Sequence, residues 1–374
     1  MERLRRILLS KKKTPSDLAK KSGVEMRRID EILAGAEATM AELRAFASAL
    51  RVQVTEFLEP VENAEPVRML FRHGFYRQEP PSADAEEPVA RAFTQALELL
   101  GTFAPPQRWF GAVPVVEESY KGAEELSLWL RAHYCDGDYI GPVQGLAELM
   151  EQTLGIPVIV GGGQIDGSSV VRRGWPMAYV AMRTFAPRML FTLAHELGHL
   201  LVHHDLSREA AFVDEDIEQA AWGKSKAEKF VDAFAATLLV PSQGIGIAFQ
   251  KIREILSIKP DAPVGDIEIV FLSRIFGVSF MVAASRCEAV ELLPKGGGAS
   301  LYEQVKKEYG NPELKADALG IPAREEIDFP SFSRILMDEA TRGVAAGSVS
   351  IGRAAEILKT TVASVVTSNR PALH

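Results

Sequence analysis

Two histidines four residues apart, with a glutamate directly after the first, stand out as residues that could do chemistry. The run is His195-Glu196-Leu197-Gly198-His199. On a helix each residue advances by about 100°, so His195 and His199 project from one face about 40° apart. Two imidazoles placed in this way can share one zinc ion. Glu196 lies about 100° round from His195, where it can reach a water on the metal without taking a ligand position.

This pattern predicts a zinc-dependent peptidase. Zinc lowers the pKa of its water towards about 7 and polarises a scissile carbonyl, while Glu196 acts as the general base. Peptide hydrolysis is the expected reaction. The alternative is a surface helix with two unrelated histidines, because a five-residue pattern arises by accident in some chains.

A catalytic zinc usually takes three protein ligands, so a third must come from elsewhere in the chain. The helix expected from Ser225 to Leu239 offers Glu228. Asp232 lies four residues further along the same face and could hydrogen-bond a ligating imidazole. The alternative for this helix is a solvated Glu/Lys face.

His203 and His204 compete with Glu228 for the third ligand position. His203 lies two turns from His195 and about 6 Å beyond His199 along the helix axis. That spacing makes it hard for His203 to close a tetrahedron.

Two stretches of the chain together resemble the ImmA/IrrE metallopeptidases. The first is Phe-Thr-Leu-Ala-His-Glu-Leu-Gly-His-Leu-Leu at 191–201, and the second is Glu228 followed by Phe-Ala-Ala-Thr-Leu-Leu-Val-Pro at 234–241. The resemblance covers roughly residues 115–290 and implies a zincin-type α+β fold, bound zinc, and cleavage of a helix-turn-helix repressor or antitoxin. The chain departs from the family pattern at Val231-Asp232, where the family tends to have Ala-Asn.

The N-terminal region has a different pattern, with apolar residues at near-helical spacing over residues 3–59. Leu18-Ala19, Gly23-Val24, Ile29 and Leu33 resemble the core positions of Xre/Cro-type helix-turn-helix domains. The helix from Glu25 would then enter the DNA major groove and present Arg27 and Arg28 to bases or phosphates. A small bundle of this pattern can also serve as a docking or dimerisation module, which leaves a homodimer open.

Charge and composition limit the partners. Of the 374 residues 47% are hydrophobic and 25% charged, as in a globular protein, and the net charge is −8. Residues 1–28 carry ten Lys or Arg against three acidic residues, a local charge of +7, so the remainder carries −15. A basic end on an acidic body suggests a local anionic partner such as DNA, although such a run is more often a solvated face.

We expect no membrane partner, because the apolar runs fall far below the roughly 20 residues that span a bilayer. The N-terminus does not read as a signal peptide, so a cytoplasmic location is expected. Only Cys135 and Cys287 are present, which supports neither a disulfide scaffold nor a Cys-x-x-Cys metal site.

The expected organisation is an α+β protein with an all-α helix-turn-helix domain at 1–62, a linker and helical lead-in at 63–112, a zincin-like domain at 113–292 and a helical C-terminal domain at 299–374. Within it, residues 77–88 mark a linker, residues 156–160 and 176–182 are strands, residues 188–203 form the long helix with the histidines, and residues 296–298 form a second linker. The C-terminal region is given no role.

Two functions follow. The first is a zinc endopeptidase that cleaves a regulatory protein. The second is a DNA-binding transcription factor whose zinc site is structural or inactive. Glu196 favours the first, because a structural site has no use for a general base beside an open coordination position.

Overall fold

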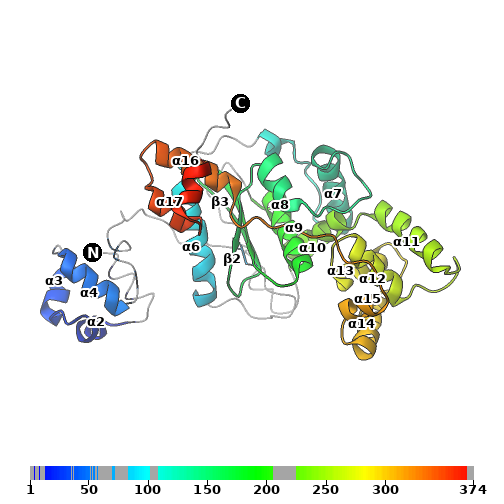
Figure 1. The fold of residues 1–374 in the computed structure, drawn as a ribbon, viewed down its shortest axis with the longest axis horizontal. Coiled ribbons are helices and arrows are strands. Elements are labelled where there is room, and N and C mark those ends of the chain that lie inside the picture. Colours follow the sequence, from blue (N-terminus) through cyan, green and yellow to red (C-terminus); the bar gives the residue numbers. More distant parts are fainter. Residues whose placement is uncertain are drawn as a thin grey trace. The chain divides into compact units, whose positions relative to one another are not determined.

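The structure is a computed structural model that describes residues 13–34, 38–50, 70–71, 83–101, 108–204 and 225–368, together with Leu4, Leu8, Ala36, Val52, Val54 and Phe57. The chain divides into two compact units, Met1–Val67 and Arg68–His374, which appear in Figure 1 with their elements labelled.

The N-terminal unit is helical, as predicted. Its helices are α2 (Pro15–Ser22), α3 (Met26–Ala34) and α4 (Met40–Leu50). Helix α2 begins at a capping box, in which Thr14 and Asp17 satisfy each other's backbone N–H groups. It ends at Gly23, whose positive φ of 72° lets the chain turn directly into α3. The buried core comprises Leu4, Leu8, Leu18, Ile29, Ile32, Phe46 and Leu50.

The second unit is built around a four-stranded sheet in the order β1-β3-β4-β2. The strands are β1 (Leu70–Phe71), β2 (Val158–Gly161), β3 (Gly167–Arg172) and β4 (Trp175–Ala181). Strand β3 pairs antiparallel with β1 and β4, whereas β2 pairs parallel with β4. The hairpin between β3 and β4 turns at Arg173 and Gly174, both with positive φ, as a tight two-residue hairpin requires.

Helices cover both faces of this sheet. Figure 1 shows it between α6 (Ala83–Leu100) and α9 (Ala186–Val202). Every residue of β4 is buried, which is expected of a central strand that is covered on two sides. Helix α10 (Lys226–Leu239) packs against α9 and against α7 (Tyr120–Tyr134). One hydrophobic core runs through α7, α9 and α10 and includes Ala178 and Val180 of β4.

Further elements complete the unit. Before β2 the chain contains η1 (Arg108–Ala112), α8 (Leu146–Glu148) and the π-helical turn η2 (Leu149–Thr153). After α10 follow α11 (Ser242–Leu256), α12 (Asp266–Ile275), α13 (Phe280–Ala289), α14 (Gly297–Tyr309) and α15 (Pro312–Ala318). The C-terminal helices are α16 (Arg334–Ala345), α17 (Ile351–Ile357) and α18 (Val362–Ser368). Helices α16 and α17 pack on α6.

The α+β class, with an all-helical N-terminal unit and a helical C-terminal region, agrees with the prediction. Two expected linkers are wrong where the structure describes them. Helix α6 already begins at Ala83, so Pro88 lies inside it, while residues 77–82 lie outside the described residues. Residues 296–298 start α14, and a Cβ on Gly298 would lie only 2.6 Å from the Cβ of Ala284. Those glycines therefore permit a close approach of α13 and α14.

Among the described helices, none is by itself long and apolar enough to cross a membrane. Two bent pairs, α10 with α11 and α12 with α13, pass by length and composition only when taken together.

Candidate metal centre

Helix α9 buries the three residues of the sequence motif. His195 and Glu196 are each 1% exposed and His199 is 2% exposed. The Nε2 atoms of His195 and His199 lie 3.1 Å apart, so both rings face one point. The helical spacing expected from the sequence thus brings the two imidazoles together.

Glu228, on the first turn of α10, faces the same point. Its Oε2 lies 3.4 Å from Nε2 of His195, and its Oε1 lies 3.2 Å from Nε2 of His199. One ligand atom from each of the three residues falls within 4.8 Å of the others. Two imidazole nitrogens and one carboxylate oxygen form a donor set that zinc accepts, with a further position left for water.

The two helices can place these groups together because they touch closely at a glycine. A Cβ on Gly198 would lie 2.8 Å from Cδ1 of Phe234 and 3.2 Å from Cβ of Val231. Side chains of α10 therefore pack directly against the backbone of α9. Its start is fixed by Ser225, whose hydroxyl accepts the backbone N–H of Glu228.

The protonation states suit a cation. Burial lowers the pKa of His199 below its ordinary value, which keeps the ring neutral. Burial acts to raise the pKa of the Glu228 carboxyl, but its contacts with His195 and His199 outweigh this and the pKa is lowered overall. A carboxylate beside the neutral His199 imidazole offers lone pairs that a bound cation would satisfy.

The outer nitrogens of both imidazoles also have partners. Nδ1 of His195 lies 3.0 Å from Oδ1 of Asp232, and Nδ1 of His199 lies 2.9 Å from Nδ1 of His203. Burial, and then the electrostatic interaction with the neighbouring His199, lower the pKa of His203 to about 4. Sequence reasoning considered His203 and His204 as ligands. The structure places His203 behind His199, and Nε2 of His204 lies 3.4 Å from the hydroxyl of Ser169.

Glu196 projects towards strand β3 and is outside the His195, His199 and Glu228 group. A Cβ on Gly167 would lie 2.8 Å from Oε1 of Glu196 and 2.3 Å from Cγ2 of Thr192. Only a glycine leaves room there for the Glu196 carboxylate. Sequence reasoning missed Gly167, although its place directly before the Ser-Ser-Val-Val run would have been the clue.

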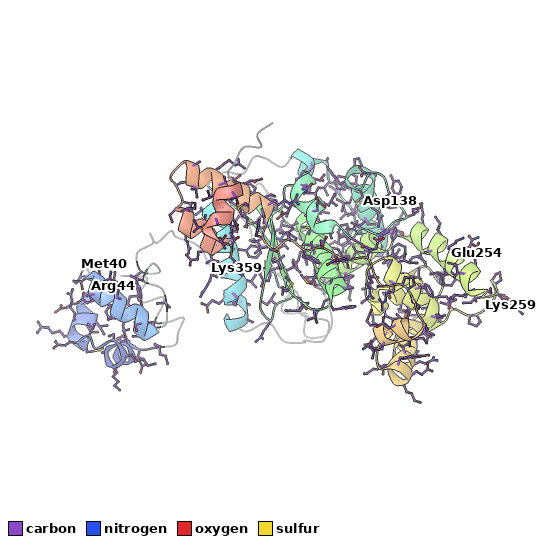
Figure 2. All side chains as sticks on the ribbon, viewed as in Figure 1. Met40, Arg44, Asp138, Glu254, Lys259 and Lys359 are labelled. Atoms are coloured by element: carbon purple, nitrogen blue, oxygen red, sulfur yellow. The ribbon has the colours of Figure 1, made fainter. Side chains whose placement is uncertain are left out.

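The two residues proposed for DNA contact differ in their surroundings. Arg27 is 89% exposed and lies 3.4 Å from Glu31. Arg28 is 33% exposed, and its Nε donates to Oε1 of Glu42 over 2.7 Å. Arg44 on α4 is also exposed (Figure 2). Arg28 therefore joins α3 to α4, whereas Arg27 points its charge into solvent.

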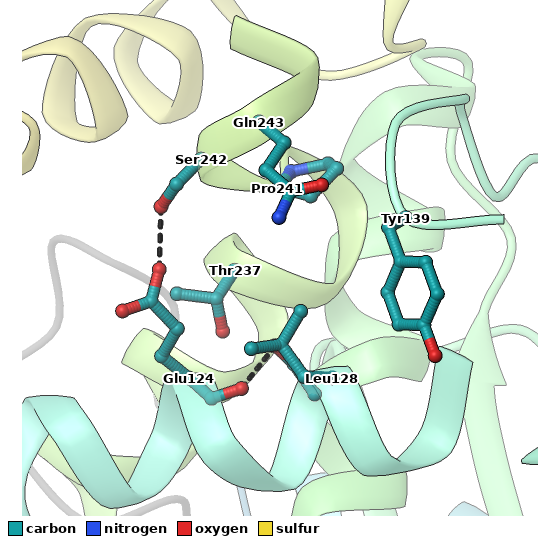
Figure 3. A pocket seen from close by; sticks show the side chains of 8 residues that line it. Glu124, Leu128, Tyr139, Thr237, Pro241, Ser242 and Gln243 are labelled. Carbon is teal, nitrogen blue, oxygen red and sulfur yellow. Dashed lines mark hydrogen bonds between the residues drawn. The ribbon is translucent and has the colours of Figure 1, made fainter. Parts of the chain in front are cut away.

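A small pocket lies between α7, α10 and α11 (Figure 3). Its lining includes Glu124, Thr237 and Ser242, and the Ser242 hydroxyl donates to the Glu124 carboxylate. At about 70 Å³ it has room for a few waters but not for a peptide. Its lining contains none of the candidate metal ligands.

Comparisons with known proteins agree with both units. The model of the IrrE N-terminal-like domain, Peptidase_M78, matches residues 152–288. The model of the Cro/C1-type helix-turn-helix DNA-binding domain matches residues 3–63. No curated protein matches the chain. Among solved structures, a Mycobacterium tuberculosis transcriptional regulator is similar at 22% identity and a TM-score of 0.30, over 45% of this chain and 46% of that chain.

The family predicted from the motifs is therefore found in the expected places. A metallopeptidase-like fold and a His-His-Glu group coincide within one of the two matches. Residues 152–288 are thus similar to the IrrE N-terminal-like domain, Peptidase_M78, and residues 3–63 are similar to the Cro/C1-type helix-turn-helix DNA-binding domain.

Proposed function

We propose that this protein is a zinc-dependent endopeptidase that cleaves a regulatory protein, with Glu196 as the general base. The observation that supports it best is the placement of Glu196. The His195, His199 and Glu228 donors face one point, while Glu196 follows His195 on the same buried helix and is not one of the three. A purely structural site would not need such a carboxylate.

Each residue has a distinct part in this proposal. His195 and His199 bind the metal through Nε2 and Glu228 binds it through its carboxylate. A zinc ion held by these residues would supply the Lewis acidity that polarises a scissile carbonyl and acidifies a water. Glu196 takes the proton of that water and returns it to the leaving amine. Asp232 accepts the Nδ1 proton of His195 and thereby keeps the opposite nitrogen unprotonated.

The proposed substrate is a helix-turn-helix repressor or antitoxin. This part rests on the family resemblance and on the residue 152–288 match. The N-terminal unit supports a regulatory setting, because its Cro/C1-type match makes DNA binding through α3 the natural proposal for it.

The test is cleavage of helix-turn-helix proteins encoded beside this one. The zinc-loaded protein is incubated with each of them and the products are measured by mass spectrometry, with a zinc chelator as the control. We expect discrete fragments that disappear with chelator. Intact substrates in the presence of fully zinc-loaded protein would favour the alternative, a DNA-binding regulator with a structural or inactive zinc site.

A further inference from the structure

His203 lies on the side of His199 that faces away from the candidate metal centre. Nε2 of His199 faces the centre, 3.2 Å from Oε1 of Glu228. Its other nitrogen, Nδ1, lies 2.9 Å from Nδ1 of His203. The far nitrogen of His203, Nε2, lies 3.5 Å from Oε1 of Glu118. The four side chains thus form one line from Glu228 to Glu118.

The chemistry of neutral imidazole assigns the protons along this line. A neutral ring carries one N–H and one lone pair, so a metal-binding Nε2 places the proton of His199 on Nδ1. That N–H can donate only if Nδ1 of His203 accepts. The proton of His203 must then sit on Nε2, where it faces the Glu118 carboxylate. Each partner therefore determines the tautomer of the next.

The packing holds this line in place. His203 is the C-cap residue that directly follows α9, and its backbone N–H donates to the carbonyl of His199 over 2.9 Å. Its side chain is 2% exposed, and its ring makes an edge contact with Phe230 of α10. A hydrogen bond in such a dry surrounding orients its partners more strongly than one in water.

Glu118 comes from a different part of the chain. It precedes Ser119, the residue that caps α7. Its side chain is 33% exposed and that of Glu228, at the other end of the line, is 29% exposed, whereas His203 and His199 between them are 2% and 3% exposed. The chain can fold back at this point because a Cβ on Gly122 would lie 2.0 Å from the carbonyl oxygen of Glu117.

We propose that His203 and Glu118 are positioning residues of the metal centre: His203 accepts the Nδ1 proton of His199, and Glu118 holds His203 in the tautomer that can accept it. This inference rests on the proposed function, since it assumes a metal at His195, His199 and Glu228. Neither residue binds the metal itself.

The experiment measures zinc affinity by competition with a chelator. Removing such a partner typically costs 10- to 100-fold in metal affinity or activity, so we expect about that loss in His203→Leu. His203→Asn keeps an acceptor close to the place of Nδ1 and should restore most of the affinity. Glu118→Gln should cause a smaller loss, because solvent can partly replace this exposed carboxylate. His204→Leu is the matched control, since that neighbouring histidine is equally buried and contacts Ser169 instead.

Thermal unfolding of the zinc-free and zinc-loaded forms separates positioning from packing. If His203 is a positioning residue, His203→Leu should reduce the rise in unfolding temperature that zinc produces. If His203 only packs, the variant should lower the unfolding temperatures of the zinc-free and zinc-loaded forms equally. ¹⁵N NMR of the wild-type holoprotein should show His199 protonated at Nδ1, which keeps the inference testable if His203→Leu does not fold.

Three results would overturn the inference. They are wild-type zinc affinity in His203→Leu, a loss of zinc affinity in His203→Asn as large as that in His203→Leu, or a proton on Nε2 instead of Nδ1 of His199. A wild-type protein that binds no zinc would overturn the proposed function as well, so the two failures are distinguishable.

Discussion

Replacing Gly167 by alanine is a sharp test of how strand β3 supports the candidate site. The added Cβ would lie 2.3 Å from Cγ2 of Thr192 and 2.8 Å from Oε1 of Glu196. Carbon atoms in contact normally lie about 3.5–4.0 Å apart, so α9 and β3 must separate by roughly 1 Å. Overpacking of this kind typically destabilises a core by about 1–3 kcal/mol. A misplacement of about 1 Å at a catalytic group can lower the rate about 100-fold.

The assay combines urea unfolding with the rate of substrate cleavage at matched zinc content. Thr192→Ser removes the Cγ2 atom that the new methyl group meets first. The double variant Gly167→Ala, Thr192→Ser should therefore recover most of the stability. It should not recover the activity, because the clash with Glu196 remains. Gly246→Ala serves as the control, since a Cβ there meets no atom within 4 Å. Wild-type stability and rate in Gly167→Ala would refute the close packing described here.

Three further predictions concern the other charged groups. Glu228→Ala should lower zinc affinity and activity together, because only two imidazoles remain, and elemental analysis with the cleavage assay checks both. Arg28 holds the pKa of Glu42 at about 2, well below its ordinary 4.5, so this pair should stabilise the N-terminal unit above pH 4.5 and lose that effect as the pH falls towards 2. Unfolding of the wild-type chain and of Glu42→Gln across this pH range measures the stabilisation that the pair provides. Arg27→Ala should weaken DNA binding and reduce its salt dependence without lowering stability, as fluorescence anisotropy would show.

The part of the site that lies on one helix could be predicted from the sequence. Helical geometry alone places His195 and His199 on one face, and the structure has their Nε2 atoms 3.1 Å apart. Glu228 was chosen from a second helix. Residue spacing could not show that this helix lies beside α9, but the family resemblance supported the choice. Its distance from the histidines depends on Gly198, whose role emerges only when α10 is in place.

Contacts between distant segments could not be predicted. Sequence spacing suggested His203 as a competing ligand, but its actual neighbours are His199 and Glu118, and the latter comes from the start of α7. Similarly, Arg28 was assigned to DNA as a cation on the expected recognition helix. Its pairing with Glu42 depends on how α3 packs against α4.

The strands also divide into those that the local sequence predicted and one that it did not. The apolar β-branched run at 156–160 and the run at 176–182 correspond to β2 and β4 within a few residues. Strand β3 was not predicted, because its Gly-Ser-Ser start has low strand propensity. The burial of β3, against which α9 packs, overrides that propensity. The Arg173-Gly174 turn was the local feature that could have revealed the hairpin.

The most direct test of the central claim is the cleavage rate of Glu196→Gln at the same zinc content as the wild-type protein. Glutamine keeps the size of the side chain but cannot take a proton, and general-base contributions are typically about 100- to 10,000-fold in rate. We predict that the variant binds zinc with wild-type affinity and loses cleavage by a factor in that range. Wild-type cleavage by a zinc-loaded Glu196→Gln protein would contradict the account.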